Sequence, residues 1–236
     1  MTALDVVLLC GGRGTRAYPD TLELPKPLLP VGDRPVVEHV MGCYARQGHT
    51  RFILAAGYKA ELLQERYAIA PEGWDVAVVD TGVDTETGDR VRLAAEAAGV
   101  GSTFFVNYAD GLGDVDLTDL VAFHHSHGAL ATVTTVPLPS QYGTLVSDDK
   151  GLVTEFREKP VLEDHWINAG YFVFERRALD DWSGPELERD TLPALSQRRQ
   201  LVAYRHRGFW RSMDTYKDRS ALTALVESAE RAPWER

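Results

Sequence analysis

Cysteine is scarce in this sequence of 236 residues, which contains only Cys10 and Cys43. Two cysteines supply neither a disulfide framework nor the ligand pattern of a zinc site. Both lie in apolar segments, so we interpret them as buried thiols. The fold must therefore rest on a core of its own, and the chain is long enough for one α/β domain with a sizeable core.

Positive charge is also in deficit, because 25 lysine and arginine residues face 35 aspartate and glutamate residues, for a formal net charge of -10. A nucleic-acid surface needs a basic footprint, so no nucleic-acid partner is expected. A single anionic nucleotide can still bind such a protein, since local basic groups and backbone amides matter more than the total charge.

Long apolar runs are missing as well, and none is long enough to span a bilayer. Asp5 lies close to the N-terminus, and no basic region precedes a cleavage site there. We therefore expect a cytoplasmic protein without a membrane partner. Low-complexity tracts and convincing internal repeats are likewise not found.

Short apolar runs alternate with helical patterns through the first half of the chain. Helices are expected from Pro35, at residues 61–67 and 90–98, and after Asp116. The apolar runs are typical of buried parallel strands, and they cover residues 6–10, 52–56, 76–79 and 103–107. This order favours a mostly parallel sheet covered on both faces.

Strand patterns dominate the second half, where helical patterns are sparse, so we expect hairpins and a mixed sheet. A final helix is predicted at about residues 216–230. The predicted strands cover residues 130–136, 143–146, 152–157, 167–174 and 201–205. His124, His125 and His127 could suggest a metal site, but only the first and last share a helix face, so we interpret them as part of a surface helix.

A glycine-rich turn directly follows the first predicted strand and consists of Gly11, Gly12, Arg13, Gly14, Thr15 and Arg16. In open α/β sheets such a turn binds phosphate, because glycine lets backbone amides approach its oxygens. The two arginines add fixed positive charge. A dinucleotide fingerprint would need glycine where Ala17 stands, and the Gly-Lys-Ser/Thr of a P-loop is absent. An ordinary glycine turn remains the alternative.

Lys26 lies between Pro25 and Pro27, ten residues after Arg16. The two prolines stiffen the backbone and would hold the ammonium group in a defined place. A solvated loop lysine is the alternative. Together, Gly-Gly-x-Gly-Thr-Arg and Pro-Lys-Pro resemble the signature of the sugar-1-phosphate nucleotidyltransferases, and the joint match is far more specific than either half.

This resemblance implies an α/β fold with a Rossmann-like three-layer, mixed, mostly parallel sheet, the nucleotide-diphospho-sugar transferase fold. It implies one domain over residues 1–236, with a nucleotide-binding half at about 1–128 and a sugar-binding half at about 129–236. The glucose-1-phosphate cytidylyltransferase branch is the most similar. The supporting segments are residues 80–82, 87–91, 110–116, 127–134, 208–210 and 232–234.

Asp110 and Asp214 match the aspartates that bind the catalytic metal in this family. Asp110 follows a predicted strand, and Asp214 stands at the start of the last helix. Mg²⁺ is commonly held by one or two carboxylates together with substrate phosphates and water. A turn residue and a helix N-cap are the respective alternatives. The family usually has glycine where Ala109 stands.

The resemblance also assigns the nucleotide base to residues 81–90. Recognition of cytosine, which presents an amino donor, needs an acceptor there, and a backbone carbonyl could supply it. We therefore favour CTP. The predicted nucleotide-binding residues of this segment are Thr81, Thr87, Gly88 and Arg90.

Glu158-Lys159-Pro160 resembles the family's Glu-Lys-Pro motif, in which the lysine binds the sugar phosphate and the glutamate a sugar hydroxyl. A strand-end ion pair is the alternative. The remaining residues predicted to contact the sugar phosphate are Gly143, Asn168 and Gly170.

We therefore expect an Mg²⁺-dependent transfer of CMP from CTP to a sugar 1-phosphate, with glucose 1-phosphate favoured and pyrophosphate released. Arg16, Lys26, Asp110 and Asp214 are the predicted catalytic residues, and a homo-oligomer is expected. Another nucleotide, sugar or cyclitol phosphate is one alternative. A non-catalytic regulator that binds nucleotide sugars is another, and a dehydrogenase is disfavoured by the glycine spacing.

Overall fold

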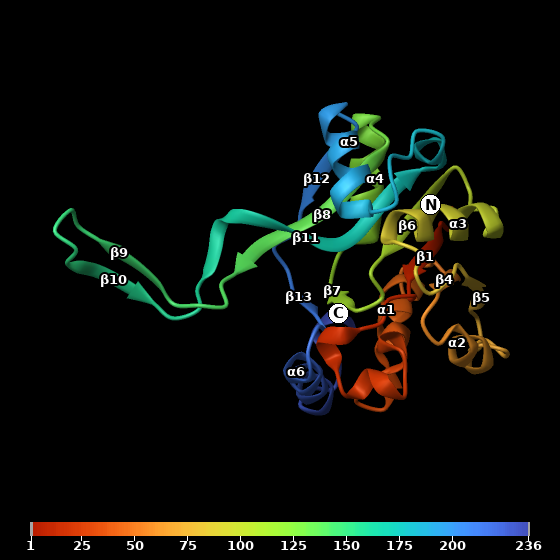
Figure 1. Cartoon of the computed structure of the whole chain (residues 1–236), viewed down its shortest axis with the longest axis horizontal. Helices are drawn as coiled ribbons and strands as arrows, with labels where there is room; N and C mark the ends of the chain where they lie inside the picture. Colours follow the sequence, from red (N-terminus) through yellow and green to blue (C-terminus); the bar gives the residue numbers. More distant parts are fainter. Residues whose placement is uncertain (1, 236) are drawn as a thin grey trace.

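The computed structural model describes residues 2–235, which form a seven-stranded sheet with the order β12-β8-β11-β6-β1-β4-β5 (Figure 1). Its strands are β1 (Asp5–Leu9), β4 (Arg51–Ala56), β5 (Asp75–Asp80), β6 (Thr103–Asn107), β8 (Ala131–Pro139), β11 (Val161–Glu175) and β12 (Leu201–Arg205). β1 is parallel to β4 and β6, β4 to β5, and β12 to β8. Only β11 opposes both of its neighbours, β6 and β8. The predicted mixed, mostly parallel sheet is confirmed.

Helices cover both faces of this sheet and form the two outer layers (Figure 1). They are α1 (Val36–Ala45), α2 (Ala60–Arg66), α3 (Thr87–Ala98), α4 (Leu117–His127), α5 (Leu192–Gln197) and α6 (Tyr216–Glu227). Side chains alternate between the faces of a strand, so β1 contributes to both cores. Val6 and Leu8 pack in the core that contains α1, whereas Val7 packs with Val91 of α3.

No helix within residues 2–235 combines the length and the apolarity that a membrane crossing requires.

Two predictions about helices were wrong in detail. α3 begins at Thr87 rather than at residue 90, because its first turn is held by a segment about 100 residues further along, through the bond from the Leu187 N–H to Thr87 Oγ1. His124 is 1% exposed rather than on the surface. Its ring lies 2.8 Å from Thr132 Oγ1 and 3.2 Å from Glu175 Oε1, so it belongs to the contact between α4 and the sheet.

Three short strand pairs lie outside the main sheet. They are β2 (Pro30–Val31) with β3 (Arg34–Pro35), β7 (Gly111–Gly113) with β13 (Trp210–Ser212), and β9 (Thr144–Ser147) with β10 (Val153–Arg157). The pair β7–β13 joins segments about 100 residues apart in the chain, directly beside the carboxyl end of β6.

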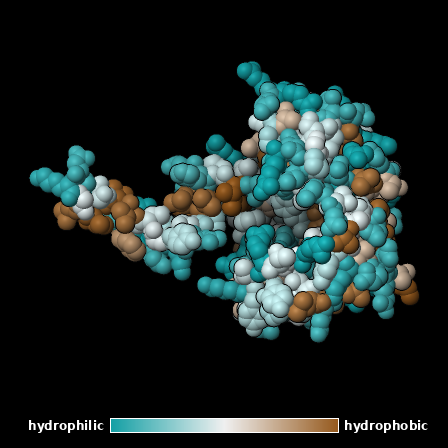
Figure 2. Space-filling view, in the orientation of Figure 1, coloured by the Kyte–Doolittle hydropathy of each residue, from teal (hydrophilic) through white to brown (hydrophobic). Residues whose placement is uncertain are grey.

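The hairpin β9–β10 extends away from the rest of the molecule (Figure 1). We call residues 140–160 the arm. Apolar or aromatic side chains that are more than half exposed lie along it, and brown, hydrophobic atoms gather on the arm in Figure 2. They are Tyr142, Leu145, Val146, Leu152, Val153 and Phe156. The alternating pattern predicted a hairpin here, but the pattern alone does not show that the hairpin leaves the body.

Candidate active site

A cavity of about 780 Å³ lies beyond the carboxyl ends of β1 and β6. Residues 9–14, 83–87 and 108–111 form much of its wall, and the second half of the chain adds Asn168, Glu188 and Asp214 among others. Ligands of open α/β sheets bind at this edge, and the volume suits a small-molecule ligand.

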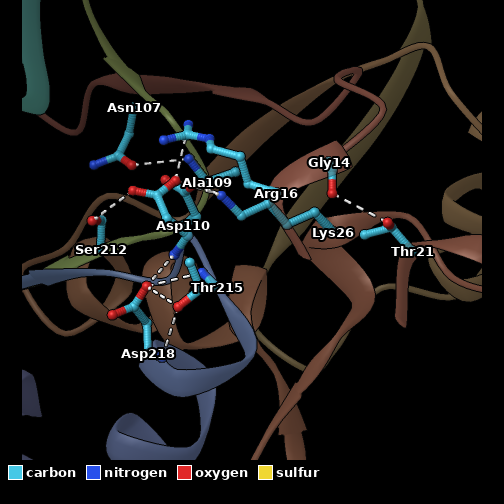
Figure 3. Close-up of polar contacts among 11 residues, drawn as sticks. Gly14, Arg16, Thr21, Lys26, Asn107, Ala109, Asp110, Ser212, Thr215 and Asp218 are labelled. Atoms are coloured by element: carbon cyan, nitrogen blue, oxygen red, sulfur yellow. Dashed lines mark hydrogen bonds and ion pairs between the residues drawn. The ribbon is translucent and has the colours of Figure 1, made fainter. Parts of the chain in front are cut away.

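The glycine-rich turn curves around one side of this cavity. Gly14 has φ 63°, which favours glycine, and it precedes the 3-10 helix Thr15–Ala17. A Cβ on Gly14 would lie 2.8 Å from Thr21 Cγ2, and the Gly14 carbonyl accepts a hydrogen bond of 3.1 Å from Thr21 Oγ1 (Figure 3). Among the described residues, none comes within 4 Å of a Cβ placed on Gly12. Contacts with Thr21 therefore hold the turn in place, while the space beside Gly12 is open.

Lys26 joins the two predicted metal-binding aspartates, of which Asp110 is labelled in Figure 3. Its ammonium group donates to Asp110 Oδ2 and, at 3.1 Å, to Asp214 Oδ1. Arg16 forms an ion pair with the same Asp214 oxygen at 3.0 Å. All four predicted catalytic residues thus meet at one place in the cavity wall.

The β7–β13 pair explains why Asp110 and Asp214 converge. Asp110 immediately precedes β7, and Asp214 lies two residues after the end of β13. Ser212 pairs with Gly111, and the Met213 N–H donates to the Asp110 carbonyl at 3.0 Å. The N-cap alternative for Asp214 is wrong. Thr215 is the N-cap of α6, so the carboxylate of Asp214 is free to face the cavity.

The charges of this cluster shift one another. Burial raises the pKa of Asp110, and the Lys26 ammonium only partly opposes that shift. Burial also acts to raise the pKa of Asp214, but Lys26 and Arg16 outweigh it and hold that pKa below its usual value. Desolvation disfavours the charged form of Lys26, yet the two carboxylates prevail and raise its pKa. An ionised lysine is therefore retained at neutral pH.

The donor set suits Mg²⁺, which prefers carboxylate oxygens. Asp110 and Asp214 both contact one ammonium group, so a single cation can be reached by both. Within residues 2–235, no group of three or more histidine, cysteine, aspartate or glutamate side chains is arranged to hold a metal. A metal here would therefore complete its shell with phosphate oxygens and water.

Arg90 organises the segment predicted to meet the base. It is 3% exposed and donates to the Ala56 carbonyl, to Thr81 Oγ1 and to the Thr85 carbonyl, each at 2.6 Å. A Cβ on Gly11 would lie 1.9 Å from its guanidinium group. Although Arg90 lines the cavity, its donors are directed to the protein, so it shapes the segment that residues 83–87 present to a ligand.

Comparison with known proteins agrees with this geometry. Residues 5–225 match the family model described as "Nucleotidyl transferase". The chain belongs to this family. It is 33% identical over 255 residues to a glucose-1-phosphate cytidylyltransferase of Salmonella typhi, with 98% of each chain covered. A mannose-1-phosphate guanyltransferase of Gibberella zeae is 34% identical over 234 residues, which cover 94% of this chain and 64% of that protein.

Structural similarity agrees with the sequence match. The structure of HddC from Yersinia pseudotuberculosis complexed with GMP-PN has a TM-score of 0.72 at 22% identity and covers 93% of this chain and 98% of its own. The predicted nucleotide-diphospho-sugar transferase fold is confirmed. The protein is a sugar-1-phosphate nucleotidyltransferase, whose substrates are a nucleoside triphosphate and a sugar phosphate.

In this nucleotidyltransferase, Asn168 lines the cavity, whereas Gly170 is not among the described residues that line it, and contact of either residue with the sugar phosphate stays a prediction. Asn168 lines the cavity and donates from Nδ2 to Tyr108 Oη at 2.8 Å, while its Oδ1 accepts from the Gly170 N–H at 2.8 Å. Gly170 has φ 79°, and a Cβ there would lie 2.5 Å from Tyr108 Cδ2. Gly170 thus allows the Tyr108 ring to pack closely.

The other three residues predicted to contact the sugar phosphate lie on the arm instead. They are Gly143, Glu158 and Lys159, and none of them is among the described residues that line the cavity. The side chain of Lys159 is 57% exposed, and its Nζ lies 3.7 Å from Glu158 Oε1. The assignment of these residues to the sugar phosphate remains a prediction.

Outside the segment expected to meet the base, sequence reasoning missed the polar side chains of Tyr108, Glu188 and Ser212, which line the cavity. Ser212 Oγ donates to Asp214 Oδ2 at 3.1 Å. Tyr108 and Ser212 each lie two residues before a predicted metal-binding aspartate, which is a signal that could have been used. Glu188 lies among several acidic residues between positions 186 and 190, and no local pattern distinguishes it.

Proposed function

We propose that this nucleotidyltransferase transfers CMP from CTP to glucose 1-phosphate with Mg²⁺ as its cofactor. The meeting of Lys26, Arg16, Asp110 and Asp214 at the glycine-rich turn carries the transfer chemistry. CTP and glucose 1-phosphate are favoured because the Salmonella typhi cytidylyltransferase is matched over 98% of its length, whereas the guanyltransferase is matched over 64%. The resemblance of residues 81–90 to the cytidylyl branch supports the same choice.

The reaction is one in-line substitution. An oxygen of the sugar phosphate forms a bond to the α-phosphorus of CTP, and the bond from that phosphorus to the bridging oxygen of pyrophosphate breaks. The nucleophile is already an anion, so no side chain has to remove a proton. Positioning and charge neutralisation therefore supply the catalysis.

Each charged residue has one task in this scheme. Arg16 and the amides of the glycine-rich turn hold the departing pyrophosphate, while Lys26 neutralises charge at the α-phosphate. Asp110 and Asp214 would hold Mg²⁺, which supplies Lewis-acid stabilisation of the developing charge. Backbone carbonyls in residues 81–90 accept from the cytosine amino group.

The proposal includes a homo-oligomer in which the arm packs against a second copy of this chain. Exposed apolar side chains such as Leu152 and Phe156 favour burial of the arm. The arm also carries Lys159, the residue predicted to bind the sugar phosphate, away from the cavity of its own chain. In the oligomer, Lys159 fixes the attacking phosphate in the cavity of a neighbouring copy.

A substrate panel tests the chemistry. Each of CTP, GTP, UTP, ATP and dTTP is combined with glucose 1-phosphate and mannose 1-phosphate, and pyrophosphate release is measured. We expect the highest kcat/KM for CTP with glucose 1-phosphate. A higher value for GTP with mannose 1-phosphate would instead favour the activity named for the Gibberella zeae protein.

A complementation experiment tests the arm. Asp110→Asn and Lys159→Ala chains with different tags are co-expressed and purified as mixed oligomers. We expect little activity from either variant alone and recovered activity from the mixture, because some cavities then combine Asp110 and Lys159 from different copies. An oligomer without recovery would contradict transfer of Lys159 between copies, and a monomer in light scattering would contradict the assembly.

A further inference from the structure

Residues 185–188 pack against the first turn of α3 through Gly88. A Cβ on Gly88 would lie 2.7 Å from the Pro185 carbonyl oxygen and 3.0 Å from the Leu187 nitrogen. The Asp89 N–H donates to that carbonyl at 3.0 Å. Gly88 therefore has a physical role distinct from contact with the nucleotide. Its missing side chain lets a segment of the second half of the chain reach the cavity wall.

This packing places Glu188 in the cavity wall. Its Oε2 accepts a hydrogen bond of 2.7 Å from Thr87 Oγ1, and its Oε1 accepts one of 2.7 Å from Tyr108 Oη. The carboxylate is thus held at both oxygens by donors from two different segments of the cavity wall.

The position of these two donors indicates which part of a nucleotide Glu188 faces. Thr87 ends the segment 83–87, which lines the cavity where the base is expected, and Tyr108 lies two residues before Asp110 at the phosphate side. In a nucleotide, the ribose lies between the base and the phosphates. A carboxylate that bridges Thr87 and Tyr108 therefore lies along the ribose.

The chemistry of a carboxylate restricts what it can bind there. An anion repels phosphate, whereas it accepts strongly from hydroxyl groups. Each carboxylate oxygen has two lone pairs, and the protein hydrogen bonds use one on each oxygen. Two neighbouring acceptors thus remain, which matches the two adjacent hydroxyls of a ribose.

We propose that Glu188 binds the ribose hydroxyls of the nucleoside triphosphate and makes the enzyme select ribonucleotides over deoxyribonucleotides. This role rests on the proposed position of the nucleotide in the cavity. It does not depend on which base the enzyme accepts, because every ribonucleoside triphosphate carries the same pair of hydroxyls.

The test compares kcat/KM for the ribonucleotide, its 2′-deoxy form and its 3′-deoxy form. The triphosphate is the one that performs best in the substrate panel, so a result other than CTP overturns the cytidylyl proposal and leaves this test intact. In the wild-type protein we expect the loss of a hydroxyl to lower kcat/KM roughly 10- to 100-fold, the value of a hydrogen bond to a charged group.

Glu188→Ala should reduce kcat/KM for the ribonucleotide by a similar factor and have little effect on a deoxynucleotide, so the preference disappears. Glu188→Gln keeps the shape of the side chain and should retain part of the preference. Glu186→Gln is the matched control, because Glu186 lies on the same segment and pairs with Arg189. It should behave as the wild type does.

Two outcomes would overturn the proposal. One is a wild-type enzyme that uses both deoxy forms as well as the ribonucleotide. The other is an equal loss for all three triphosphates in Glu188→Ala, which would mean that the carboxylate only holds Thr87 and Tyr108 in place. Thermal unfolding of each variant identifies a loss that comes from misfolding.

Discussion

Among single residues, Lys26 determines the charge balance of the cavity. Its ammonium group contacts Asp110 and Asp214, and Arg16 contacts Asp214 as well. Burial acts to raise the pKa of both carboxylates, and the two cations oppose it by favouring the ionised forms. A variant that removes one acid therefore changes the electrostatics of the cavity while leaving its shape intact.

We expect Asp110→Asn or Asp214→Asn to lower kcat by roughly 100-fold or more, since each removes one charged ligand that acts on the transition state. Pyrophosphate release at saturating Mg²⁺ measures the effect, and the thermal unfolding temperature should change little. Asp33→Asn is the control, because the Asp33 side chain is 86% exposed. Near-normal turnover in either cavity variant would contradict the metal assignment.

Ala109 stands where the family usually has glycine, and its φ of 61° lies in the left-handed region. This conformation costs a residue with a Cβ about 1–2 kcal/mol, and glycine loses more backbone entropy on folding, by about 0.5–1 kcal/mol. We therefore expect Ala109→Gly to raise the free energy of unfolding by about 0.5 kcal/mol.

Urea denaturation measures this gain. Ala97→Gly is the matched control, because Ala97 lies within α3, where glycine costs about 1 kcal/mol. A loss of stability in Ala109→Gly similar to that of the control would show that the left-handed backbone at residue 109 carries no strain.

The cavity residues differ in how far sequence could identify them. Lys26 and the glycine-rich turn are recognisable because a phosphate site needs a fixed cation and exposed amides at short spacing. Glu188 could not be found this way, since its position depends on how residues 185–188 pack on Gly88. The same packing gives Gly88 a structural role, whereas sequence reasoning assigned Gly88 to nucleotide contact.

Among the helices, α6 begins with a capping box directly after Asp214, which lines the cavity. The Asp218 backbone N–H donates to Thr215 Oγ1 at 3.2 Å, and the Asp218 carboxylate accepts from the Thr215 N–H at 2.8 Å. The same carboxylate accepts from the Asp214 N–H at 3.2 Å. The cap therefore orients the backbone that carries Asp214.

We expect Thr215→Ala to lower the free energy of unfolding by about 1 kcal/mol through loss of the N-cap, and to lower kcat because Asp214 is less well oriented. Ser220→Ala, within the same helix, should leave both nearly unchanged. Chemical denaturation and pyrophosphate release measure the two effects. A variant that loses stability but keeps full kcat would separate the cap from the orientation of Asp214.

The central strands were predictable from sequence because a strand buried on both faces must be a continuous apolar run, as β1, β4 and β6 are. The start of α3 and the full length of β11 could not be predicted from sequence, since both depend on contacts with residues that are distant in the chain. β11 spans Val161–Glu175, although only residues 167–174 show the pattern of a buried strand. Its first residues pair with β8 towards the arm.

For the whole molecule, several buried histidines make stability depend on pH. Burial lowers the pKa of His39, His49, His124 and His127 below the usual value. The folded state therefore binds fewer protons than the unfolded state once the pH falls below about 6.5. Stability is greatest above that pH and declines as these side chains are forced to take up protons.

We expect the urea midpoint to fall as the pH is lowered from about 7 to 5.5, and His124→Asn to weaken this dependence. His165→Asn should leave it unchanged, because His165 lies exposed on β11. Equilibrium unfolding at several pH values provides the measurement. A midpoint that stays constant over this range would contradict the account.

The strand pair β7–β13 bears on how the enzyme is made. A ribosome releases residues in order, and Asp110 emerges about 100 residues before β13, which brings Asp214 to its side. A nascent chain can fold much of its sheet before Asp214, the second of the two cavity aspartates, has been made. Activity therefore appears only after β13 and Asp214 have been made, so a product that terminates before β13 would be folded in part yet inactive, and could not consume triphosphate in the cell.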